Sequence, residues 1–174
     1  MLVRLLRALR LDGGVYQEVK DDPQATFQAL SVLLMGSLSL TLAGLVRLVP
    51  LRSPAGGLQL FAWSLASALA GWVAMGLLAY GVGRGLRRPA SLLSLLRTLG
   101  FAQAPGLLYG LLAVPGVEVW VNAGVLLWML LGMAVGLRQA LVVSRVPAFF
   151  MAAAGLLVAV GVRDLLRGAV LGGA

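Results

Sequence analysis

Long uncharged runs alternate along this chain with short charged segments. Asp22 and Arg47 enclose 24 uncharged residues, Arg52 and Arg84 enclose 31, and the later runs hold 20, 19 and 17 residues. A helix needs ~20 residues, with a range of about 17 to 25, to cross the hydrocarbon layer of a membrane. The pattern therefore predicts an all-α polytopic integral membrane protein, a helical bundle with five transmembrane helices.

The predicted spans cover residues about 25–46, 58–82, 99–114, 119–137 and 146–162. Together they form one transmembrane domain, residues 23–174, after a polar N-terminal segment, residues 1–22. Because Pro105 removes a backbone donor and glycines lie on both sides of it, we expect the third span to be a broken or kinked helix.

The first eleven residues place arginines three apart among leucines. On a helix this spacing gives a basic face and an apolar face, which predicts a short amphipathic helix lying in the membrane interface. Gly13 and Gly14 are expected to end it. The stretch from Val15 to Asp22 carries four charged residues, so we expect it to lie in water.

Two spans carry small residues at spacings of three or four. Ser67, Gly71 and Ala74 form such a stripe in the second span, and Gly132 and Gly136 do so in the fourth. Small stripes let helix backbones approach closely. These residues are candidate contacts for helix packing, for a membrane-protein partner or for a second copy of the chain.

The composition excludes a soluble domain. The chain is 60% hydrophobic and only 11% charged, whereas soluble proteins hold about 25% charged residues. Its mean hydropathy is +0.97. A net charge of +8 would indicate nucleic acid in a soluble protein, but basic residues beside apolar spans serve membrane insertion, and no nucleic-acid partner is expected. The absence of isoleucine and the single lysine indicate a GC-rich, bacterial genome.

The basic residues also predict the orientation. Successive gaps between spans lie on alternate sides of the membrane. One side collects Arg4, Arg7, Arg10, Lys20, Arg84, Arg87, Arg88, Arg97, Arg138 and Arg145, and the other only Arg47, Arg52, Arg163 and Arg167. The positive-inside rule then places the N-terminus in the cytoplasm and the C-terminus outside the cell membrane.

Catalytic chemistry has little support in the sequence. There is no cysteine or histidine, and no two acidic residues share a span. General acid–base or nucleophilic catalysis needs such partners. We expect neither an enzyme, nor a cofactor, nor a metal site.

Polar residues inside spans are the remaining candidates, because they are costly in lipid and often functional. Gln103, two residues before Pro105, is the deepest and forms a candidate intramembrane polar site. Four aromatic residues, Trp63, Tyr80, Tyr109 and Trp120, are interpreted as membrane-interface residues. Four arginines are candidate contacts for anionic lipids: Arg84, Arg87, Arg88 and Arg97.

Several segments resemble the Yip1 domain family of multi-pass membrane proteins. They are LRLDGGVYQEVKDDPQATFQAL (9–30), GFAQAPGLLYG (100–110), and Trp128 followed by GLRQALVVSRVPAF (136–149). The resemblance implies five helices and a cytoplasmic N-terminus. Eukaryotic family members bind Rab-type GTPases, but this chain lacks their long N-terminal region, so the resemblance is taken for architecture and not for activity.

Three functions remain open at this stage. The first is a non-enzymatic scaffold or partner-binding subunit, which the small stripes and the basic cluster favour. The second is a small transporter or channel that uses the break at Gln103 and Pro105. The third is a lipid-handling protein whose arginines hold anionic headgroups.

Overall fold

The computed structural model describes residues 1–47, 54–88 and 90–171, and within them all regular structure is helical. Eight elements follow one another: α1 (Leu2–Leu9), α2 (Gly13–Asp21), α3 (Ala25–Arg47), α4 (Pro54–Gly85), α5 (Leu92–Ala102), the 3₁₀ helix η1 (Ala104–Ala113), α6 (Glu118–Leu141) and α7 (Arg145–Leu171). The prediction of an all-α fold is confirmed for these residues. In the sequence, Pro50 predicts a loop and Pro89 predicts a helix end, and both residues lie outside the described ranges.

Four of the helices are long and apolar enough to cross a membrane: Ala25–Arg47, Gly57–Gly85, Glu118–Leu141 and Arg145–Leu166. These match the first, second, fourth and fifth predicted spans. The third predicted span is two shorter elements, α5 with 11 residues and η1 with 10. It is therefore interrupted, as the glycines and Pro105 indicate.

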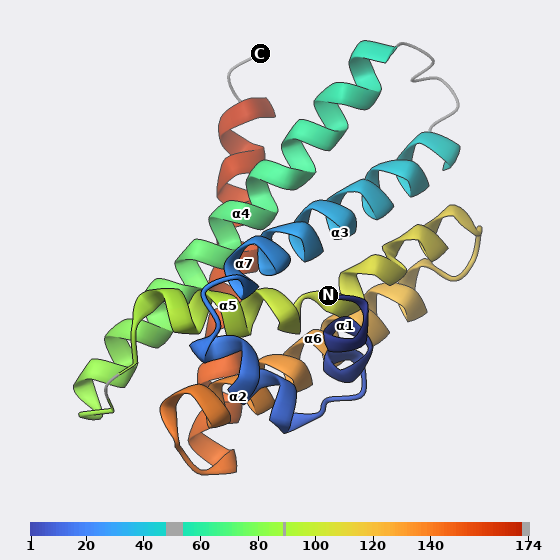
Figure 1. The fold of residues 1–174 in the computed structure, drawn as a ribbon. Coiled ribbons are helices and arrows are strands. Elements are labelled where there is room, and N and C mark those ends of the chain that lie inside the picture. The colour runs from blue at the N-terminus through green and yellow to red at the C-terminus, as the bar shows by residue number, and fades with distance from the viewer. Residues whose placement is uncertain (48–53, 89, 172–174) are drawn as a thin grey trace.

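Five segments form a ring. Around the ring, each segment packs against the next in the order α3, α4, α7, α6 and η1, and η1 packs against α3 to close the ring. Figure 1 shows the long helices side by side, with the α3 and α4 ends next to the grey loop pointing away from α2. We call the end of the bundle that carries α2 the α2 end, and the opposite end, where Arg47 and Glu118 form an ion pair, the far end.

The interruption of the third segment changes what fills the ring. Ser91 caps α5, accepting a hydrogen bond from the Ser94 amide at 3.1 Å, and α5 packs on α3, α4 and α6 at the α2 end. After Gln103 the chain continues as η1, which packs on α3 and α6. α5 therefore occupies the interior of the ring, whereas η1 forms part of its wall.

The N-terminal segment packs on the bundle more closely than the sequence indicates. The first break falls at Leu11, which has a left-handed backbone (φ 57°), and Gly13 and Gly14 begin α2 instead of ending a helix. Asp12 caps α2, accepting from the Gly14 amide at 2.8 Å. Val15, Tyr16 and Val19 are fully buried against α5 and α6, so one face of the stretch expected in water is part of the core.

The last helix also differs from expectation. The fifth predicted span ends at Val162, before the charged residues Arg163 and Asp164. α7 instead continues without interruption to Leu171. Arg163 consequently lies on a helix of the ring.

Candidate functional site

A cavity of about 190 Å³ lies inside the ring. All five ring segments contribute to its wall: Val32, Leu33, Gly36, Ser37 and Leu40 of α3; Ser64, Ser67, Ala68, Gly71, Trp72 and Met75 of α4; Gln103, Gly106 and Tyr109 at the α5–η1 break; Asn122, Leu126 and Met129 of α6; and Leu156, Ala159, Val160 and Arg163 of α7. Most of the wall is apolar, and a few polar groups converge on the space, as in small-molecule sites generally.

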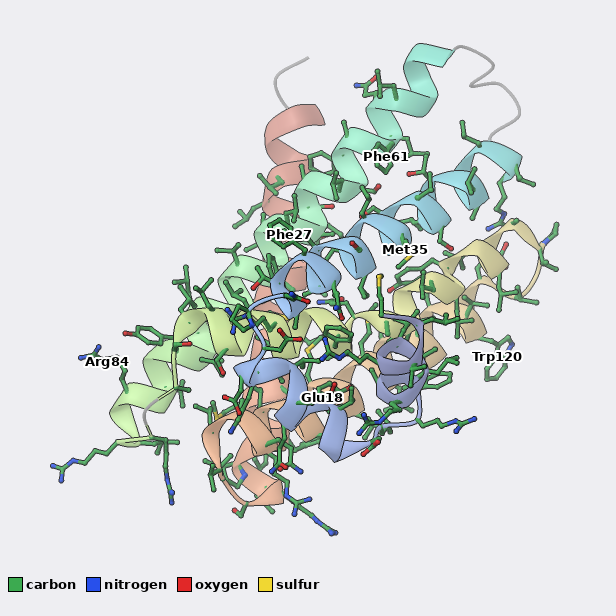
Figure 2. All side chains as sticks on the ribbon, in the orientation of Figure 1. Glu18, Phe27, Met35, Phe61, Arg84 and Trp120 are labelled. Carbon is green, nitrogen blue, oxygen red and sulfur yellow. The ribbon has the colours of Figure 1, made fainter. Side chains whose placement is uncertain are left out.

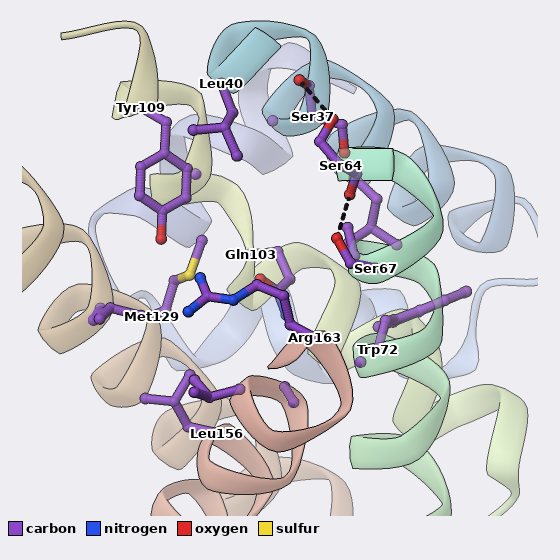
Figure 3. A pocket seen from close by; sticks show the side chains of 18 of the residues that line it. Ser37, Leu40, Ser64, Ser67, Trp72, Gln103, Tyr109, Met129, Leu156 and Arg163 are labelled. Carbon is purple, nitrogen blue, oxygen red and sulfur yellow. Dashed lines mark hydrogen bonds between the residues drawn. The ribbon is translucent and has the colours of Figure 1, made fainter. Parts of the chain in front are cut away.

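Three serines form the polar corner between α3 and α4 (Figure 3). The Ser64 hydroxyl donates to the Ser37 carbonyl at 3.3 Å or to the Phe61 carbonyl at 3.0 Å, and the Ser67 hydroxyl donates to the Ser64 carbonyl at 3.1 Å or to the Trp63 carbonyl at 2.9 Å. The Ser37 hydroxyl is buried and has no hydrogen-bond partner among the described residues. A buried hydroxyl without a partner has unused capacity to bind a ligand.

The polar groups on the other side come from three elements. Gln103 lies at the junction of α5 and η1, Tyr109 on η1 and Arg163 on α7. Figure 3 shows the Arg163 side chain entering the cavity beside Gln103 and Met129, with the Tyr109 hydroxyl directed to the same space. Tyr109, interpreted from the sequence as a membrane-interface residue, lines the cavity in the structure.

The η1 backbone is held against α3 by one side chain. The Ser39 hydroxyl donates to the Leu107 carbonyl at 2.7 Å and accepts from the Gly110 amide at 2.8 Å. A β-carbon at Gly110 would lie 3.0 Å from this hydroxyl, so glycine allows the approach. Because irregular backbone away from water needs such partners, this contact keeps η1 in the wall.

Below the cavity, at the α2 end, the interior is closed. The Trp72 indole donates to the Leu96 carbonyl at 2.8 Å and ties α4 to α5. Gly132 and Gly136 face the same core: β-carbons there would lie 3.2 Å from the Tyr16 hydroxyl and 2.6 Å from Thr98 Cγ2. The small residues of α6 thus let α2 and α5 pack closely within the chain.

The stripe on α4 also packs internally. A β-carbon at Gly71 would lie 3.2 Å from Ala159 Cβ on α7, Ser67 is 8% exposed, and Ala74 is half-buried. Of the residues proposed as contacts for a partner, the glycines and Ser67 are already packed against other helices of the same chain.

The four candidate lipid-binding arginines do not form one group. Arg84, Arg87 and Arg88 are exposed around the end of α4, where Arg84 donates to the Tyr80 hydroxyl at 3.0 Å (Figure 2). Arg97 is half-buried and donates to the Thr26 hydroxyl at 2.8 Å and to the Lys20 carbonyl at 3.2 Å. It joins α5 to the α2–α3 connection.

Charged side chains fasten α1 to α2. Arg4 binds Glu18 and Asp22 at 2.8 and 2.7 Å, and Arg7 binds Asp12 and Glu18 at 2.7 and 2.8 Å. Arg4 holds the pKa of the Asp22 and Glu18 carboxyls below their usual values, and Arg7 does the same for Asp12. Burial raises the pKa of the Tyr16 hydroxyl, so that group stays protonated.

Sequence reasoning identified Gln103 and Pro105 but not their partners in the cavity. The signal for Arg163 was present: Ala152, Leu156, Ala159 and Arg163 recur at helical spacing, so Arg163 continues the inward face of α7. Ser67 and Gly71 were identified only as helix-packing residues, and Ser37 and Ser64 gave no signal, because serine in a span often only bonds to its own helix.

The fold and the cavity together define a protein whose described regular structure is all helical, with four helices able to cross a membrane and a mostly apolar internal cavity that carries a few polar groups. Comparison with family models, with curated proteins and with solved structures finds no match to this chain. Among the described residues, no group of three or more metal-ligating side chains occurs.

Proposed function

We propose that this chain is a non-enzymatic, five-span protein of the cell membrane that binds a small polar solute in its cavity and passes it across the membrane. The observation that carries the proposal is the position of the cavity. It lies inside a ring of five segments, at the level where the third segment is broken at Gln103. Broken helices commonly build the solute sites of membrane transporters.

The orientation in this proposal follows the basic residues. The positive-inside rule places the α2 end in the cytoplasm and the far end outside. The cavity residues Tyr109, Asn122 and Arg163 belong to the parts of η1, α6 and α7 nearer the far end. The closed α2 end and the cavity above it then correspond to an outward-facing state, in the Yip1-like five-span architecture proposed from the sequence.

The first test is transport by the purified protein in liposomes. We expect it to pass small polar solutes, and we expect Gln103→Leu to reduce the rate because the amide lines the cavity. Phe150→Leu on the exposed side of α7 is the matched control, since Phe150 is 67% exposed. Liposomes that pass none of the small ions or solutes tested would contradict the proposal.

The second test asks whether the cavity opens to the outside. Because the chain has no cysteine, Ser64→Cys supplies a single thiol in the cavity and Thr98→Cys supplies one in the closed α2 end, where Thr98 is 0% exposed. An impermeant thiol reagent added outside should label the first variant and not the second. Labelling of neither variant would contradict an outward-facing cavity.

Lipid binding is a second proposal with its own observation. Tyr80, Arg84, Arg87, Arg88 and Ser91 surround a groove at the end of α4. Basic groups there suit anionic headgroups, each worth roughly 1 kcal/mol near an anionic surface. Arg87→Gln with Arg88→Gln should lower the anionic lipid that co-purifies, whereas unchanged lipid would contradict it.

The scaffold function is a weaker proposal after the fold is known. Its motivation was the small stripes, and these pack against α7, α5 and α2. Photocrosslinking from exposed positions on α4, such as Leu77, tests it; adducts with lipid alone would count against a protein partner or a second copy.

A further inference from the structure

We propose that the cavity selects a small oxyanion, with a carboxylate or phosphate group, and that Arg163 is the residue that selects it. This inference rests on the proposed function, because it names the class of solute for the same cavity.

The charge of the cavity lining is the first step. Among the described residues that line the cavity, Arg163 alone carries a formal charge. Its side chain is 59% exposed, so water partly screens the guanidinium, and the remaining positive charge still attracts an anion that enters the apolar-walled cavity. The remaining polar groups of the lining are hydroxyls and amides, which can donate hydrogen bonds to an anion.

The carboxylates of the chain do not supply this counter-ion. Four of the six acids lie between Asp12 and Asp22, at the α2 end, and Glu118 is paired with Arg47. Only Asp164 is near, with 3.5 Å between its Oδ1 and the Arg163 Nε. The two side chains are 59% and 60% exposed, so water screens this pair, and such surface pairs contribute little.

The direction of Asp164 supports the same conclusion. Adjacent residues of an α-helix point about 100° apart, and Asp164 does not line the cavity. The terminal guanidinium nitrogens of Arg163 make no hydrogen bond within the described residues, and Figure 3 shows them inside the cavity. Two parallel N–H donors match the two oxygens of a carboxylate or phosphate.

A cation does not fit this lining. Hard cations in proteins take carboxylate and carbonyl oxygens, and no carboxylate lines the cavity. The size limits the solute further. At about 190 Å³ the cavity is below the ~300 Å³ at which drug-sized sites begin. A small organic anion with a short apolar part matches both the charge and the walls.

The test uses reagents that differ in charge. Ser64→Cys is treated from outside with an anionic reagent, 2-sulfonatoethyl methanethiosulfonate, and with a cationic one, the 2-(trimethylammonium)ethyl analogue. Each rate is divided by the rate of the same reagent with a free thiol in solution. We expect the anionic reagent to be favoured about tenfold, from the Coulomb attraction to one cation at partly screened distance.

Substitution of the arginine gives the decisive comparison. Arg163→Gln should abolish the preference for the anionic reagent, and Arg163→Lys should keep most of it. Leu58→Cys lies on α4, the helix that carries Ser64, and is 69% exposed; it should give the same ratio with and without Arg163→Gln. If Ser64→Cys does not fold, Leu40→Cys on α3 offers a second thiol in the lining.

Protection experiments identify the anion and its source. Acetate, butyrate or inorganic phosphate should slow modification of Ser64→Cys, and choline should not. If a lipid headgroup is the occupant, nanodiscs with phosphatidylglycerol should slow modification relative to nanodiscs of phosphatidylcholine alone, without added solute. Protection by neither the free anions nor the anionic lipid would overturn the inference.

The outcomes separate this inference from the proposed function. Reaction of Ser64→Cys with neither reagent would remove the accessible cavity, and with it both proposals. Equal normalised rates, or a preference that survives Arg163→Gln, would overturn the selection of oxyanions and leave an accessible cavity for solutes of another class.

Discussion

The two ends of the bundle are built from the same helices but differ in what lies between them. At the α2 end, α5 fills the ring, and glycines on α6 let Tyr16 of α2 and Thr98 of α5 pack closely against α6. At the far end the chain continues as η1, which is part of the wall and is hydrogen-bonded to Ser39 of α3. The space that remains is the cavity.

The difference teaches how a bundle of apolar helices can hold a cavity between its own segments. One proline-containing break moves a single segment from the interior to the wall. The packed core at the α2 end supplies the stability, and the cavity nearer the far end can then carry polar groups that would be costly in lipid. Figure 2 shows Trp120, which is 79% exposed, projecting from the start of α6.

The largest expected effect is the loss of Tyr16. Tyr16 is fully buried, so Tyr16→Ala should cost ~3–5 kcal/mol in the free energy of unfolding, measured by denaturant titration in detergent micelles. Tyr16→Phe, which removes only a hydroxyl 3.4 Å from the Ala8 carbonyl, should cost much less. Tyr109→Ala at the far end should also cost less, because its ring borders a cavity; equal losses at the two ends would contradict the comparison.

The second effect tests the close packing on α6. Gly136→Ala places a methyl group 2.6 Å from Thr98 Cγ2 and 3.3 Å from Tyr16 Cδ1, and should cost ~1–3 kcal/mol of stability by overpacking. Gly124→Ala on the same helix meets nothing within 4 Å and should stabilise by roughly 0.5–1 kcal/mol. Thermal unfolding of the two variants should therefore shift in opposite directions.

The closed end and the open end were not equally predictable from the sequence. The uncharged runs locate four spans within a few residues, because in lipid an apolar run of sufficient length becomes a helix. The glycines Gly132 and Gly136 and the break at Pro105 were also visible, since their backbone chemistry is local. These features depend on one segment at a time.

What the sequence did not predict depends on contacts between segments. Val15, Tyr16 and Val19 are buried although their neighbours in the sequence are charged. They are buried because this face of α2 packs against α5 and α6. The cavity likewise needs Ser37 and Arg163 from helices 126 positions apart along the chain. No spacing within one segment reports that arrangement.

A third effect concerns how the α1–α2 unit is fastened at the closed end. The folded protein lowers the carboxyl pKa of Asp12, Glu18 and Asp22, so their pairing stabilises α1–α2 above the usual pKa of about 4 and is lost as pH falls through the lowered values. Trp128 donates to the Leu9 carbonyl at 2.9 Å, so its fluorescence reports on α1. In a variant whose only tryptophan is Trp128, we expect a change below about pH 4 and none between pH 5 and 8.

The control for this effect replaces the two arginines of α1 that pair with these carboxyls. Arg4→Gln with Arg7→Gln should flatten the acid transition, because the carboxyls then have no ion-pair partner on α1. High salt should weaken the fastening in the unsubstituted chain, since these pairs are exposed and screened. An acid transition unchanged in the double variant would assign it to other groups.

The smallest expected effect is at the open end. The Ser37 hydroxyl is buried and has no partner among the described residues, so Ser37→Ala should leave stability unchanged or raise it by up to about 1 kcal/mol. Ser64→Ala instead removes a hydroxyl that donates to the Phe61 carbonyl at 3.0 Å, and it should cost roughly 0.5–1.5 kcal/mol of stability. Thermal unfolding measures both. If the hydroxyl of Ser37 serves the solute, Ser37→Ala should also slow liposome uptake in a protein of undiminished stability. A variant that is equally stable and equally active would assign that serine to the lining alone.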